Sequence, residues 1–161
     1  MKITGAMPSR CLLDKSVKKT AKRQHPRRPS RRGPVVLVVD DEPDMRHLLK
    51  AILSARARGR VIMAETSEQA LELAGQDQVD VVISDINRWP GMNGLQFLKV
   101  FRLAHPSTPT IMLSGSITPA RQRRARRLGA FRCLSKPGTP DEILRVVRAA
   151  LERRMGRRSA Y

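Results

Sequence analysis

The chain has few cysteines and no apolar run of membrane length. Its two cysteines, Cys11 and Cys133, lie far apart among 161 residues and match no metal-binding or redox spacing. This argues against a disulfide framework and agrees with a reducing cytosol. No apolar run approaches a membrane span, and the basic N-terminus lacks the apolar segment of a secretory signal. We therefore expect a cytoplasmic protein with one self-sufficient domain and tails, and no membrane partner.

Acidic residues are almost absent from the first 34 positions, where eleven Lys and Arg residues accompany only Asp14. This segment supplies more than half of the net charge of +18. Its prolines and its lack of apolar periodicity predict that residues 1–33 form a basic, disordered N-terminal arm. One interpretation is a solvated leader, a transit peptide or the product of an upstream start codon. The other is an arm that binds nucleic acid by releasing its counterions. Because basic tails more often solvate than recognise, we expect the first.

After Pro34 the pattern changes to short apolar runs that alternate with amphipathic segments. The runs expected as strands are residues 35–39, 60–65, 79–84, 109–114 and 130–135. The helices are expected over 43–58, 66–75, 93–105, 118–129 and 139–154. In the first of them, Met45, Leu48, Leu49, Ile52 and Leu53 recur at helical spacing, which predicts one buried face. Five alternating strand–helix units predict an α/β fold with a parallel sheet covered by helices on both faces.

Polar residues stand where four of these strands end. They are Asp40 and Asp41, Asp85, Ser114 and Lys136. In open parallel sheets, ligands bind beyond the carboxyl ends of the strands, so we expect these side chains to share one crevice. Neighbouring carboxylates repel one another, and Mg²⁺ with oxygen ligands relieves that repulsion. A lone carboxylate beside such a metal can accept a phosphoryl group, while a lysine and a hydroxyl hold its oxygens. A single aspartate at a strand end is more often a helix cap, but five such residues together favour a phosphoryl-transfer site.

The segments "VVDDEPDMRHLL", "VVISD…PGMNGLQFL", "IMLSGS" and "LSKP" resemble the receiver domain of two-component response regulators, over roughly residues 34–152. The resemblance implies a doubly wound, flavodoxin-like five-stranded parallel sheet that accepts phosphate from a histidine kinase or a histidine phosphotransfer protein. It implies that Asp85 is the phosphoacceptor, that Ser114 is the switch hydroxyl, and that Lys136 is the site lysine before a cis Pro137. Mg²⁺ would be held by Asp40, Asp41, Asp85 and the backbone carbonyl of Asn87.

The same resemblance implies a signalling phosphoacceptor that catalyses at most its own phosphorylation and dephosphorylation, and so is not an enzyme in the usual sense. Only a short basic tail, residues 153–161, follows the expected domain. We therefore expect a stand-alone receiver that passes its signal to a protein partner. A haloacid-dehalogenase-like phosphatase would need two aspartates one residue apart after the first strand, and "DDEP" does not supply them.

The chain departs from the receiver pattern in three places. Pro90 lies five residues after Asp85 instead of four, which puts the position of Asn87 in question. Trp89 in this loop either covers the site or packs on the loop, and we expect the second. Cys133 stands where the family has its switch aromatic, and we expect Phe131 to lie on the same strand face. Gly138 replaces an apolar residue and is expected to loosen the start of the last helix.

These departures and the basic surfaces keep a second hypothesis open. In it, the chain is a binding module that kept the receiver fold but lost efficient phosphorylation. "RQRRARR" places five arginines within residues 121–127, on the helix that belongs to the output surface in this family. Such a surface would bind an acidic protein or nucleic acid, or it would simply be solvated.

Overall fold

Strands and helices alternate along the whole folded region. The computed structural model describes residues 33–56, 59–87 and 91–158. The strands are β1 (Val35–Val39), β2 (Arg60–Ala64), β3 (Val81–Asp85), β4 (Thr110–Ser114) and β5 (Arg132–Ser135). The helices are α1 (Pro43–Arg56), α2 (Ser67–Gln76), α3 (Gly94–Ala104), α4 (Pro119–Arg127) and α5 (Pro140–Arg158). The predicted order of elements is confirmed, whereas the predicted arm, residues 1–33, falls almost entirely outside the described residues.

The five strands form one parallel sheet in the order β2-β1-β3-β4-β5. The order reverses at β1, because β2 lies on one side of it and β3 on the other. Crossovers therefore run in opposite directions from this point, which opens a crevice between the carboxyl ends of β1 and β3. The doubly wound α/β fold expected from the alternation is confirmed.

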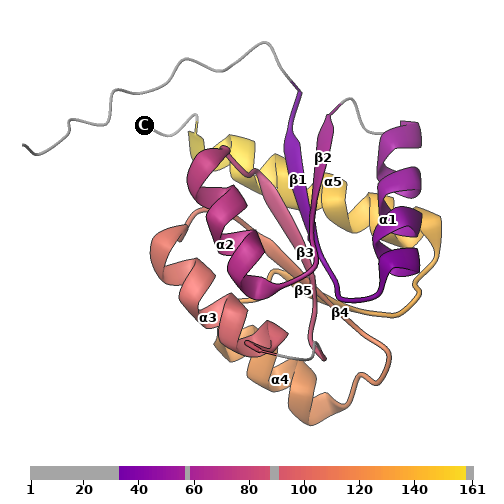
Figure 1. Ribbon diagram of the computed structural model, residues 1–161, viewed down its shortest axis with the longest axis vertical. Coiled ribbons are helices and arrows are strands. Elements are labelled where there is room, and N and C mark those ends of the chain that lie inside the picture. The colour runs from indigo at the N-terminus through magenta and orange to yellow at the C-terminus, as the bar shows by residue number, and fades with distance from the viewer. Residues whose placement is uncertain (1–32, 57–58, 88–90, 159–161) are drawn as a thin grey trace, which may run out of the picture. The chain divides into compact units, whose positions relative to one another are not determined.

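Helices cover both faces of the sheet, with α1 and α5 on one face and α2, α3 and α4 on the other (Figure 1). Alternate residues of β1 show why: Val36 and Val38 pack with α1 and α5, while Leu37 and Val39 pack with α2 and α3. The β-branched runs are thus buried on both faces, as in other parallel sheets.

The apolar stripes of two helices are narrower than the sequence predicts. Leu48 is predicted to lie on the buried face of α1, but it is 44% exposed, and Val100 of α3 is likewise 41% exposed although Phe97 and Phe101 beside it are buried. The sheet covers only the centre of each helix face, so Met45 and Leu49 are buried while Leu48, at the edge of the stripe, meets solvent.

Local signals set the helix ends. The Thr66 side chain caps α2 by accepting from Gln69 N, and Asn93 forms a capping box with Gln96 at the start of α3.

The C-terminal helix is longer than expected, because α5 continues to Arg158, through most of the predicted tail. Among the described residues, no helix has the length and apolar character needed to cross a membrane.

Candidate functional site: an acidic crevice with one lysine

The carboxyl ends of β1, β3, β4 and β5 bring the predicted polar residues to one edge of the sheet. Asp40 directly follows β1, Asp85 is the last residue of β3, Ser114 ends β4 and Lys136 directly follows β5. Asp40, Asp85 and Ser114 are buried, at 3% exposure or less. Buried polar groups at the end of an apolar strand carry a desolvation cost, which is acceptable only where they find partners.

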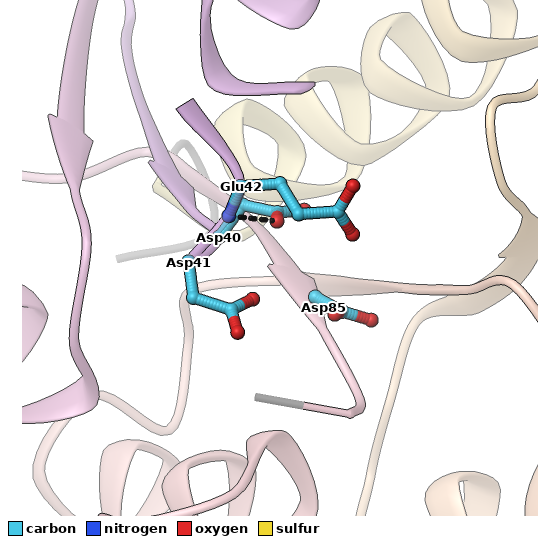
Figure 2. A group of neighbouring side chains, drawn as sticks. All are labelled: Asp40, Asp41, Glu42 and Asp85. Atoms are coloured by element: carbon cyan, nitrogen blue, oxygen red, sulfur yellow. Dashed lines mark hydrogen bonds between the residues drawn. The ribbon is translucent and has the colours of Figure 1, made fainter. Parts of the chain in front are cut away.

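Four carboxylates gather in this crevice, from Asp40, Asp41, Glu42 and Asp85. One oxygen of each lies within 4.8 Å of an oxygen of all the others. In Figure 2 the Asp41 side chain points toward Asp85 from the turn after β1, and the Glu42 side chain extends above both. The first turn after β1 is fixed by Asp40, whose Oδ1 accepts a hydrogen bond of 3.0 Å from Glu42 N (Figure 2).

Lys136 places its ammonium group among these carboxylates. Its Nζ lies 2.8 Å from Asp40 Oδ2, 3.1 Å from Asp85 Oδ2 and 3.1 Å from Glu42 Oε1. Burial by itself lowers the pKa of Lys136, but hydrogen bonds to Asp40 and Glu42 outweigh it and hold the pKa above its ordinary value. The lysine is therefore fully charged at neutral pH, and its ammonium group faces Asp85.

Burial has the opposite effect on Asp40. It raises the pKa of Asp40 above its ordinary value, and the hydrogen bonds with Lys136 and Glu42 N offset this only in part. The carboxylate belongs to a crowded pair with Asp85, whose charge raises the pKa of Asp40 further. Its Oδ2 lies 2.8 Å from Lys136 Nζ, and Lys136 also contacts Asp85 and Glu42. A second cation near Asp40, in addition to Lys136, would stabilise the charged form of this carboxylate.

Ser114 and Asp85 are connected through Asn87. Asn87 N donates to Asp85 Oδ1 over 3.2 Å, and Asn87 Nδ2 donates to Ser114 Oγ over 3.5 Å. The Ser114 hydroxyl itself donates to Ser116 O and accepts from Ser116 N, so it closes the turn after β4. The loop residues Trp89 and Pro90, on which the sequence interpretation of this region also depended, lie outside the described residues.

Two residues of the site were not predicted from the sequence. Glu42 adds a fourth carboxylate and a third partner for Lys136, and its position next to Asp40 and Asp41 was the signal available. Arg46, one turn into α1, donates to Asp40 O over 2.7 Å and to Asp41 O over 3.1 Å. Since Arg46 also lies 3.8 Å from Glu65 after β2, it holds the acidic turn against the neighbouring strand.

The expectation that Phe131 shares a strand face with Cys133 is wrong. Cys133 packs with Met112 and Ala125 on the α4 side, whereas Phe131 packs against the core on the α5 side, where Arg153 lies over its ring. The period-two rule fails because Phe131 precedes β5, which begins at Arg132. Phe131 therefore offers no aromatic ring on the face where Cys133 stands.

The turn after Lys136 matches the receiver pattern. The Lys136–Pro137 peptide bond is cis, as the resemblance implies, and Gly138 follows with φ of +68°. A Cβ at Gly138 would lie 3.2 Å from Ser135 O. Glycine is thus used for a left-handed turn that delivers the chain into α5, and not only as a loose helix start.

The donor set of the crevice fits Mg²⁺. Its ligand atoms are carboxylate oxygens, which hard divalent cations prefer. Four carboxylates face one ammonium group, so the cluster retains an excess of negative charge after Lys136 is counted. A divalent cation held by Asp40, Asp41 and Asp85 would offset most of this excess.

Comparison with known proteins agrees with this geometry. The family model for the response regulator receiver domain matches residues 36–148. The chain belongs to the response regulator receiver domain family.

Relatives and solved structures share the same region. The putative response regulator NtrX-like of Rickettsia bellii is 34% identical over 120 residues, which is 73% of this chain and 24% of that protein. The transcriptional regulatory protein CpxR of Escherichia coli is 36% identical over 118 residues, 73% of this chain and 49% of that protein. The chain thus spans between a quarter and a half of these relatives, and the matched region is one part of each.

Among solved structures, the signal receiver domain of an HD domain-containing protein from Pseudomonas fluorescens aligns with a TM-score of 0.73 and 32% identity, covering 78% of this chain and 99% of that one. Chemotaxis protein CheY4 of Vibrio cholerae aligns with a TM-score of 0.69 and 30% identity, covering 74% and 99%. Receiver domains of this kind are signalling phosphoacceptors, which interact with histidine kinases and downstream effectors.

Proposed function

We propose that the chain accepts a phosphoryl group on Asp85, with Mg²⁺, from a histidine kinase or a histidine phosphotransfer protein, and then acts as a switch for a protein partner. The observation that carries the proposal is the contact of Lys136 Nζ with Asp85 Oδ2, beside three further carboxylates. A carboxylate that faces both a fixed cation and a cluster suited to a divalent metal is prepared to receive a phosphoryl group.

Each residue then has a separate task. Asp85 supplies the attacking oxygen, and its Oδ1 is oriented by Asn87 N. Lys136, held by Asp40 and Glu42, stays beside the phosphoryl oxygens and neutralises part of their charge. Asp40 and Asp41 would hold Mg²⁺, together with Asp85 and the Asn87 carbonyl, and the metal when bound supplies charge neutralisation for the transferred group.

Ser114 is the proposed switch residue. Its hydroxyl now closes the turn with Ser116, and Asn87 links that hydroxyl to Asp85. A phosphoryl group on Asp85 would offer strong acceptor oxygens to the Ser114 hydroxyl. To donate to them, the hydroxyl must give up its hydrogen bond to Ser116 O.

We expect the chain to work in the cytoplasm, where kinases draw on ATP. That it acts without a further domain stays a prediction.

The test is phosphorylation with acetyl phosphate and Mg²⁺, read by intact mass. We expect the parent chain to gain one phosphoryl mass, Asp85→Asn to gain none, and Asp80→Asn to label like the parent. Asp80 is the control because it lies at the amino end of β3, away from the crevice, where it accepts from Val35 N. Labelling that survives Asp85→Asn would remove the assignment.

A second candidate is a receiver-fold binding module that is not efficiently phosphorylated. The observation in its favour is Cys133, since no aromatic ring from Phe131 replaces the missing switch aromatic on its face. If the parent gains no mass with acetyl phosphate and Mg²⁺ while remaining folded, this candidate replaces the first.

A further inference from the structure

Helix α4 carries an unusually dense positive charge. Five of its nine residues are arginines and none is acidic, and only Ala125 is buried. All five arginines are exposed: Arg121, Arg123, Arg124, Arg126 and Arg127. Arg123, Arg126 and Arg127 are spaced three and four residues apart, so their guanidinium groups leave the helix on one side. The solvent face of α4 is thus a cationic surface, here called the α4 arginine face.

The described part of the chain does not neutralise this surface. Its ion pairs join Arg46, Arg60, Lys136 and Arg154 to carboxylates, and none of them includes an α4 arginine. Arg121 donates to Ser116 O over 3.2 Å, which leaves its charge unpaired by any described carboxylate. Like charges at these spacings destabilise a helix. A helix face that only contacts solvent would be more stable with both acidic and basic side chains. The all-basic arrangement therefore indicates a negatively charged partner.

The chemistry of the face distinguishes between acidic partners. Protein interfaces are centred on apolar or aromatic anchors, with charge concentrated at the rim. The large apolar side chains exposed on the described surface are Leu48, Val100, Leu103 and Met155, and they lie on α1, α3 and α5. The α4 face therefore has charge and no anchor, which matches interfaces with nucleic acid. Arginine also binds phosphate through two parallel N–H donors.

We propose that the α4 arginine face binds the phosphate backbone of nucleic acid, without reading its sequence. Phosphate contacts are expected to dominate, because among the described elements no helix-turn-helix or other groove-reading motif presents α4 to base edges. This binding lies outside the proposed phosphoryl transfer, since the α4 arginines make no contact with Asp85 or Lys136 in the described structure. Its affinity falls steeply with salt, as counterions return to the backbone.

The experiment is a salt titration of the full chain binding to a labelled duplex DNA of random sequence. The α4 variant carries Arg123→Gln, Arg126→Gln and Arg127→Gln. The control carries Lys50→Gln, Arg145→Gln and Arg148→Gln, which removes the same charge from exposed positions of α1 and α5. Because each phosphate contact adds about 0.9 to the slope of log affinity against log salt, the α4 variant should lose about 2–3 from that slope. The control should lose less than about 1.

Three results would overturn the proposal. DNA binding that is absent even at low salt removes it outright. Equal losses in the two variants assign the effect to net charge and not to α4. Binding of polyglutamate that requires the α4 arginines, with DNA binding that does not, assigns the face to an acidic protein. Acetyl phosphate labelling of Asp85 is measured in every variant, so failure here and failure of phosphoryl transfer are separate outcomes.

Discussion

Gly94 should be the least replaceable glycine near the site. It is the first residue of α3, its N–H donates to Ile86 O over 3.1 Å, and it is buried. A Cβ at this position would lie 1.9 Å from Asp85 O and 2.8 Å from Ile86 Cα. Both atoms belong to the backbone at the end of β3, so no flexible side chain can move aside. Gly94→Ala would therefore push α3 away from the strand that presents Asp85.

The depth of this backbone clash sets the expected loss in the free energy of unfolding of Gly94→Ala. Overpacking of a well-packed interior costs about 1–3 kcal/mol, and a backbone clash of this depth belongs at the upper end, about 3 kcal/mol. For a domain of this size that corresponds to a fall in Tm of roughly 10 °C. Gly75 of α2 is the matched control, since a Cβ there meets no atom within 4 Å. Gly75→Ala should stabilise the protein, by up to about 1 kcal/mol, because alanine favours the helix.

Urea unfolding followed by circular dichroism measures both variants. We expect the transition midpoint to fall for Gly94→Ala and to rise slightly for Gly75→Ala, with the slope m unchanged in each. Asp85 labelling by acetyl phosphate should also slow in the first variant alone, since its clash is with the backbone of Asp85. If Gly94→Ala is as stable as Gly75→Ala, α3 does not approach the backbone at the end of β3 this closely.

Three further predictions concern charge and turn geometry. The pKa of Asp40 is higher in the folded protein than in the unfolded chain, so ionisation of Asp40 opposes folding. Protonated Asp40 adds its full share to the free energy of unfolding below pH 3.8, and this share is lost as the pH rises through the folded-state pKa. Asp40→Asn should then be at least as stable as the parent at pH 7 in metal-free buffer, yet gain less stability from added Mg²⁺; a clear loss without metal would mark Asp40 as structural. Lys136→Met should cost about 3 kcal/mol at pH 7 without metal, because it leaves buried carboxylates unpaired, and less with saturating Mg²⁺. Because the pKa of Lys136 is raised, charged Lys136 adds its full share to the free energy of unfolding below pH 10.5 and loses it only as the pH rises through the higher folded-state pKa. If the stability cost of Lys136→Met vanishes by pH 9, the ion pairs of Lys136 are contradicted. Gly138→Ala should cost about 1–2 kcal/mol, since φ is +68°, and thermal unfolding that matches the parent would argue against the left-handed turn.

The order of elements and the gathering of Asp40, Asp85 and Lys136 in one crevice follow from the sequence alone. Strand length, β-branched runs and helical periodicity are local properties, and they predict the alternation of strands and helices. Because parallel strands meet at one edge, the residues after each run, such as Asp40, Asp85 and Lys136, could be assigned to a common crevice. The caps at Thr66 and Asn93 are local for the same reason, since each side chain binds the turn that follows it.

Contacts between distant segments were decided by the tertiary structure. The position of β1 between β2 and β3 is a pairing preference that no single run encodes. Whether Leu48 or Leu49 of α1 is buried depends on how the helix is rotated against the sheet. The link from Lys136 to Glu42 spans 94 residues, and the face taken by Phe131 depends on where β5 begins. Local propensity specifies which elements form, but these arrangements arise only when the elements pack and each buried charge must find its partner.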